Sequence, residues 1–164
     1  MSKFRIALLF AALATVPAAA HAQVLQERNV SLSLAQEIAQ GAVDACAAKN
    51  FNVTATVVDR AGLVRAVLRA DRAGPHTIEA SRAKAFTASS ARSTTTMIME
   101  NAEKNPAARH LASIEGFLLV GGGVPVKAGD DVIGAIGVGG APGGHLDEEC
   151  ANAGIAKVQA KLKS

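Results

Sequence analysis

Glycine constrains this 164-residue chain most strongly between residues 121 and 154, a segment that holds eleven of its fifteen glycines. Glycine loses more conformational entropy on folding than other residues, so regular structure accepts it mainly where backbones approach closely or φ is positive. Here the glycines alternate with β-branched residues on both sides of a turn at residues 128–131. The pattern predicts two short strands around that turn, followed by a glycine loop that leads into a helix. Such a loop either holds a ligand or lets a helix pack on a bare sheet.

The first 22 residues have the three parts of a secretory signal peptide. Lys3 and Arg5 give a positive start, residues 6–16 form an apolar run, and Ala20-His21-Ala22 is a small-x-small cleavage site. The apolar run is too short to span a bilayer. We therefore expect a periplasmic or secreted protein with no membrane span after cleavage.

Composition limits the function classes that remain. Without residues 1–22 the chain has fifteen basic against fourteen acidic residues and three aromatic side chains, Phe51, Phe86 and Phe117. Nucleic-acid binding requires a basic stripe or aromatic stacking platforms, and neither is present. The length suits a loose arm at residues 23–32 and one domain at residues 33–164. Export would allow a disulfide between Cys46 and Cys150, although two buried free thiols fit their apolar context equally well.

Apolar periodicity and turn signals predict the order helix–strand–strand–helix–helix–strand–strand–strand–helix. The predicted helices begin at Ser33, at residue 77, at Ser93 or Thr94, and near Leu146, and the second of them is rich in Ala and Ser, which indicates close packing against another backbone. The predicted strands are residues 53–59, 63–70, 117–120, 124–127 and 132–138. Short links between successive strands favour an α+β domain with a five-stranded antiparallel sheet.

Two sites could bind an anion or act as a base. The glycines match neither a dinucleotide fingerprint nor a phosphate loop with its lysine. The loop at residues 139–145 still presents backbone N–H groups at the start of a helix, which attract negative charge. Lys84 lies in an apolar helix, where it could act as a base or Schiff-base former, or pair with Asp59 or Asp71.

Several motifs follow one another along the chain. They are Val57-Val58-Asp59-Arg60-Ala61-Gly62, the turn Arg69-Ala70-Asp71, SRAKAFTA at residues 81–88, GGGVPV at residues 121–126, and residues 133–138 through 147–151. In this order they resemble the GlcG/HbpS family, from about residue 32 to the C-terminus. The resemblance implies a profilin-like α/β fold with a five-stranded antiparallel sheet between helices. It also implies an exported, oligomeric haem-binding protein, because members similar to HbpS are of this kind. The related C-terminal domain of PduO-type proteins also binds haem.

This resemblance makes the histidines outside the signal peptide, His76, His110 and His145, the first residues to test as iron ligands. The nearest candidates are His76, His110 and the hydroxyl run 94–96 centred on Thr95, with Met97 or Met99 as a thioether. The side chains that could pair with propionates are Arg69, Arg82, Lys84 and Arg109. Three Phe are few for porphyrin walls, so we expect a shallow site or one completed at a subunit interface.

The predicted function is therefore an exported haem carrier, store or sensor rather than a catalyst. The alternative is a binding module or enzyme for a small organic acid such as a hydroxy acid. In that alternative, the loop at residues 139–144 and a cation, Arg69 or Lys84, would hold a carboxylate.

Overall fold

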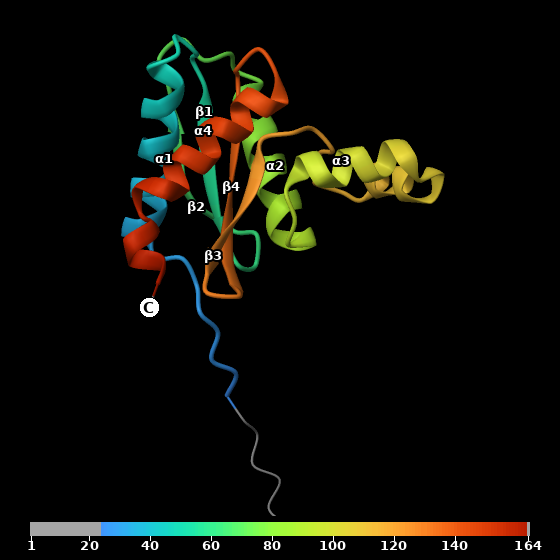
Figure 1. Cartoon of the computed structure of the whole chain (residues 1–164), viewed down its shortest axis with the longest axis horizontal. Coiled ribbons are helices and arrows are strands. Elements are labelled where there is room, and N and C mark those ends of the chain that lie inside the picture. The colour runs from blue at the N-terminus through green and yellow to red at the C-terminus, as the bar shows by residue number, and fades with distance from the viewer. Residues whose placement is uncertain (1–23, 164) are drawn as a thin grey trace, which may run out of the picture.

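The computed structural model describes residues 24–163 and contains a four-stranded sheet with helices on both faces (Figure 1). The main elements are α1 (Leu32–Ala47), β1 (Thr54–Asp59), β2 (Val64–Arg69), α2 (Thr77–Ala91), α3 (Thr95–Lys104), β3 (Gly123–Ala128), β4 (Asp131–Gly139) and α4 (Gly144–Lys157). Two 3-10 segments, η1 (Pro106–Ser113) and η2 (Gln159–Leu162), follow α3 and α4. The predicted signal peptide lies outside the described residues.

The sheet is antiparallel throughout, in the order β2-β1-β4-β3. The predicted α+β class, an antiparallel sheet flanked by helices, is therefore confirmed, but the prediction of a fifth strand at residues 117–120 is wrong. Residues 117–120 contact α2 instead of a strand. The amide of Leu118 donates to the Thr87 hydroxyl at 2.8 Å, and the ring of Phe117 packs edge-on against that of Phe86 with centroids 6.1 Å apart. A four-residue apolar run has the same sequence pattern whether it pairs in a sheet or packs against a helix.

Two apolar layers lie on opposite faces of the sheet. The larger lies beneath α1 and α4, where buried Ile38 and Ala151 meet strand residues such as Val57 and Ile136. The smaller joins α2 to the sheet through Val58, Ala85, Ala88 and Ala135. The hydroxyl groups of Thr54 and Thr56 also face α2, since they hydrogen-bond Thr77 and Ser81, each at 2.7 Å.

The glycines of the sheet bring α2 close to its backbone. A β-carbon on Gly137 would lie 2.0 Å from the Ser81 carbonyl oxygen, and one on Gly123 would lie 2.5 Å from that of Lys84. Any side chain there would force α2 away from the sheet. The expected close packing of the Ala- and Ser-rich helix is therefore confirmed, and this part of the glycine segment serves packing.

Two features fix the first helix. Its N-cap is Ser31, whose hydroxyl accepts from the Leu34 amide at 3.3 Å, so the predicted start at Ser33 is wrong by one residue. The buried Val30 just before it donates a backbone hydrogen bond to the Ile133 carbonyl.

A disulfide between Cys46 and Cys150, with Cα atoms 5.5 Å apart, joins α1 to α4. Of the two alternatives for these cysteines, a disulfide or two free thiols, the structure shows the disulfide.

One part of the chain extends away from this body. Helix α3 and the η1 segment that folds back along it project from one side of the sheet (Figure 1). No helix within residues 24–163 is long and apolar enough to cross a membrane.

Candidate functional site

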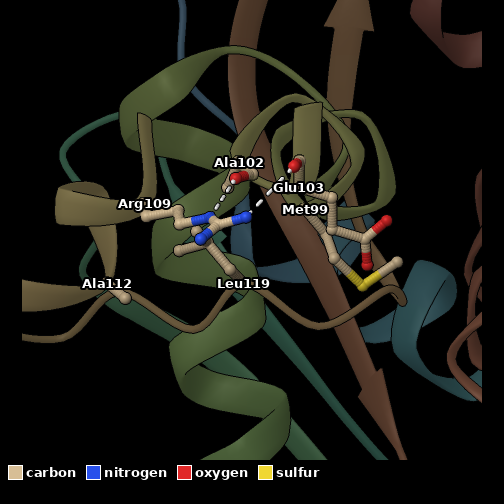
Figure 2. A pocket seen from close by; sticks show the side chains of 6 residues that line it. All are labelled: Met99, Ala102, Glu103, Arg109, Ala112 and Leu119. Atoms are coloured by element: carbon tan, nitrogen blue, oxygen red, sulfur yellow. Dashed lines mark hydrogen bonds between the residues drawn. The ribbon is translucent and has the colours of Figure 1, made fainter. Parts of the chain in front are cut away.

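An apolar pocket of about 440 Å³ lies where η1 folds back on α3. Its lining residues are Met99, Ala102, Glu103, Arg109, Ala112 and Leu119 (Figure 2). Arg109 lies against the end of α3, where Nε donates to the Ala102 carbonyl at 3.3 Å and Nη2 to that of Glu103 at 3.5 Å (Figure 2). These bonds satisfy carbonyl groups that a helix end leaves unpaired and hold the guanidinium beside the pocket.

A second hollow, of about 330 Å³, adjoins this pocket at Met99. Its lining residues are Thr96, Met99, Glu100, Val120, Gly121, Gly144 and His145. The two hollows share Met99, and their other walls include the consecutive residues Leu119 and Val120. We call them together the α3 groove. It combines apolar walls with a thioether, an imidazole, the guanidinium of Arg109 and the carboxylates of Glu100 and Glu103.

The imidazole of His145 has a defined local position at the start of α4. A β-carbon on Gly143 would come within 2.8 Å of its Cε1, so the ring lies over the glycine two residues before it. His76 has the same relationship to Gly74 at the start of α2, where the corresponding distance is 2.7 Å. His76 and His145 are both exposed, but His76 belongs to neither hollow of the groove.

The other predicted ligands lie in different surroundings. His110 is exposed on η1, next to Arg109 in sequence, and does not line the groove. Thr95 is fully buried and its hydroxyl accepts from the Gly123 amide at 2.8 Å, which joins α3 to β3. Arg69 is exposed on β2 and donates to the Ala73 carbonyl.

Lys84 is buried beneath the glycine loop and belongs to an ion pair. Its Nζ lies 2.8 Å from Asp147 Oδ2 and donates to the Val138 carbonyl at 2.9 Å. The predicted partners, Asp59 and Asp71, are both wrong. Asp59 instead accepts from backbone amides of its own hairpin and from Arg65, because the β1–β2 turn curls around its carboxylate.

One amide of the expected anion loop at residues 139–145 is bound by a carboxylate of the protein itself. The Ala141 amide donates to Asp147 Oδ1 at 3.0 Å, while the other oxygen of that carboxylate holds Lys84. The Ala141 amide and Lys84, one of the two cations named for the organic-acid alternative, are thus already paired within the protein. No group of three or more His, Cys, Asp or Glu within residues 24–163 could hold a metal ion.

The structure therefore places four residues from the wider set of candidates along the α3 groove: Met99 lines both hollows, Arg109 lines the first, and Thr96 and His145 line the second. Sequence reasoning missed the walls Ala112, Leu119 and Val120. The pair Asn105-Pro106 was the available sequence signal for a new helical turn after α3. The Asn105 side chain caps η1 by accepting from the Ala107 amide at 3.1 Å, and the chain then folds back along α3.

Comparison with known proteins identifies the family. The family model described as "Haem degrading protein HbpS-like" matches residues 30–156. This chain belongs to the HbpS-like family. No curated protein matches it.

Solved structures agree with this HbpS-like assignment. A double mutant of HbpS from Streptomyces reticuli is 38% identical, covering 87% of this chain and 97% of that one, with a TM-score of 0.78. The Klebsiella pneumoniae protein ORFY is 27% identical over 85% of this chain and 97% of its own, with a TM-score of 0.80. The PduOC:heme complex shares the fold at 21% identity and a TM-score of 0.70, covering 79% of this chain and 94% of that one.

Proposed function

We propose that this HbpS-like protein is an exported haem-binding protein and that the α3 groove is its haem site. The observation that carries the proposal is that two adjoining hollows with apolar walls share Met99, while Arg109 lines one and His145 the other, in a member of this family. Imidazole and thioether are the two commonest neutral donors to haem iron, and a guanidinium pairs well with a propionate. The chemistry of the groove therefore fits the group.

The side chains of the α3 groove have different roles toward haem in this proposal. His145 is the iron ligand and Met99 supplies a second donor, while Arg109 pairs with a propionate. Leu119 and Val120 contribute apolar surface that excludes water from the porphyrin. A bound haem would supply the iron centre, whose redox chemistry is the property of the cofactor.

Export is supported by two independent features. The sequence pattern of residues 1–22 is typical of a secretory signal peptide, and disulfides such as Cys46–Cys150 persist in oxidising compartments. Carrier, storage and sensing roles all require reversible haem binding by the exported chain. A test of export is the location of the mature protein after cell fractionation, together with its N-terminal sequence.

Self-association would deepen a shallow site. Three of the exposed large apolar side chains, Met97, Ile114 and Val120, lie on or beside the projecting α3–η1 segment, with exposed fractions of 63%, 46% and 42%. A second copy covering them would enclose the groove further. Sedimentation velocity of the purified protein, with Met97→Glu as the disrupting variant, tests this expectation.

The decisive experiment is a hemin titration of the mature protein followed by its Soret band. We expect saturable binding that His145→Ala weakens at least tenfold with a shifted Soret maximum, and that Arg109→Ala weakens severalfold with the maximum unchanged. His76→Ala is the matched control, because its ring also lies over a glycine at a helix start but away from the groove. An unchanged hemin spectrum with the wild type would refute haem binding. Loss of binding with His76→Ala or His110→Ala would instead refute the assignment of the α3 groove as the haem site.

A further inference from the structure

We propose that Asp147 is a positioning residue that fixes His145 within the α3 groove through the bond of its side-chain oxygen to the Ala141 amide, while Lys84 neutralises its buried carboxylate. This inference rests on the haem site proposed above and adds two residues that do not line that site. Asp147 would set how the imidazole is presented to the iron, in addition to any effect that the ion pair has on the stability of the fold.

The pair ties together three elements that are far apart in sequence. Lys84 projects from α2 and binds both the Val138 carbonyl on β4, at 2.9 Å, and the Asp147 carboxylate on α4, at 2.8 Å. Both charged side chains are only 4% exposed. Buried hydrogen-bonded ions hold their neighbours rigidly, because movement would leave a charge unpaired in a medium of low dielectric constant.

The carboxylate of Asp147 also holds the loop that carries His145. Its second oxygen accepts from the Ala141 amide at 3.0 Å, so it spans the loop between β4 and α4. The Asp147 amide in turn donates to the Gly143 carbonyl at 3.1 Å. Since the His145 ring lies over Gly143, the direction of the imidazole depends on a loop conformation that Asp147 fixes from inside.

The same junction positions the opposite wall of the groove. A β-carbon on Gly121 would lie 2.7 Å from the Thr96 hydroxyl, and one on Gly144 would lie 2.9 Å from the Gly121 carbonyl oxygen, so the two loops touch through their backbones. The Thr96 hydroxyl hydrogen-bonds Glu148 on α4. The loop beneath His145 is thus held against the loop and helix that carry Val120 and Met99.

Two double variants separate positioning from stability. Lys84→Met with Asp147→Leu removes both charges and also the acceptor for the Ala141 amide. Lys84→Met with Asp147→Asn removes both charges but retains an oxygen that can accept from that amide. Neither leaves an unpaired buried charge, which would itself destabilise the fold. The two variants therefore differ chiefly in the bond that fixes the loop.

We expect the Leu variant to weaken hemin binding at least tenfold and to shift the Soret maximum, while the Asn variant stays within threefold of the wild type. In a His145→Ala background the two double variants should bind hemin equally, since the residue being positioned is gone. Equal weakening by the Leu variant with and without His145 would overturn the proposal, because it would indicate a general structural effect.

A measurement without haem makes the test independent of the proposed function. Amide hydrogen exchange of residues 140–146 should be faster in the Leu variant than in the Asn variant, and equal exchange overturns the positioning role. Absence of hemin binding by the wild type would instead refute the proposed function and leave this comparison valid. If the Leu variant does not fold, Asp147→Glu replaces it: a Soret spectrum and hemin affinity unchanged by that shifted carboxylate overturn the proposal.

Discussion

A β-carbon on Gly154 would lie 2.4 Å from the carbonyl oxygen of Ile38, so α4 crosses α1 with the two backbones in direct contact. Gly41 lies at the same crossing, where its own β-carbon would be 3.0 Å from the Gly154 Cα. This crossing lies over the larger apolar layer, and the Cys46–Cys150 disulfide links the same two helices covalently. The α1–α4 face is therefore held by contacts that leave no room for an added methyl group.

Gly154→Ala should destabilise the protein for this reason. Overpacking of a tight contact costs about 1–3 kcal/mol, and here the obstacle is backbone that cannot rotate away. Chemical denaturation with urea measures the effect. Asn152→Ala, an exposed change on the same helix, serves as the control and should stay within about 0.5 kcal/mol. Equal stability of the two variants would contradict the close crossing.

Removal of the disulfide should lower stability substantially. Cys46 and Cys150 are 104 residues apart, and a cross-link closing a loop of this size stabilises by about 4.7 kcal/mol in the chain-entropy treatment. The Cys46→Ala/Cys150→Ala variant should therefore lose about 2–5 kcal/mol in denaturant unfolding. Reducing agent should lower the Tm of the wild type and leave that of the variant unchanged. A Tm of the wild type that does not respond to reduction would show that the bond carries little of the stability.

Acid should weaken the same α1–α4 face. A hydrogen bond from Lys49 holds the pKa of Glu149 below its usual 4.5, and hydrogen bonds from Gln40 and then Lys157 hold that of Asp44 below 3.8. A carboxyl whose pKa is lower in the folded state stabilises the fold above its usual pKa, and this contribution is lost as the pH falls through the folded value.

The variant Glu149→Gln/Asp44→Asn should therefore differ most from the wild type near pH 6. The two Tm curves should converge as the pH falls below 3.8 and through the lowered folded-state pKa values, because protonation of the wild type then removes the same interactions. Circular dichroism melts at half-unit pH intervals measure this. A difference in Tm that stays constant over the whole range would contradict the assigned pKa directions.

Breaking one half of the buried ion pair should cost more than removing both halves. Lys84→Met alone leaves the Asp147 carboxylate buried without its cation, which destabilises by about 3–5 kcal/mol. Lys84→Met/Asp147→Asn leaves no buried charge and should recover a large part of that loss. Urea unfolding of the two variants gives the comparison. Equal stability would show that the charges are not coupled.

Local sequence pattern predicted most of the elements because their signals are short-range. The strands at residues 54–59 and 131–139 come from β-branched runs next to turns, and α2 comes from its Ala- and Ser-rich composition. Residues 117–120 carry a similar apolar signal, but Leu118 and Phe117 bind Thr87 and Phe86, which are 31 residues earlier in the chain. Pattern alone could not distinguish sheet pairing from packing against α2.

The site was harder to predict because it depends on which residues face one another. His145 and Met99 were among many candidate donors, and their common groove arises only because η1 folds back on α3 and the two glycine loops touch. The predicted ligands His76 and His110 have equally suitable chemistry but lie outside the groove. Their exclusion from the site thus remains a prediction for the hemin titration.

By itself, the sequence determined the α+β class, the positions of the main helices and strands, and the need for bare backbone where α2 meets the sheet. These follow from periodicity and from the steric demands of glycine, which act between neighbours along the chain. Only the tertiary structure decided that Cys46 joins Cys150, that Lys84 pairs with Asp147, and that this pair fills the supposed anion loop. Contacts between residues 63 or 104 positions apart leave no periodic trace, because their geometry is fixed by packing of whole elements.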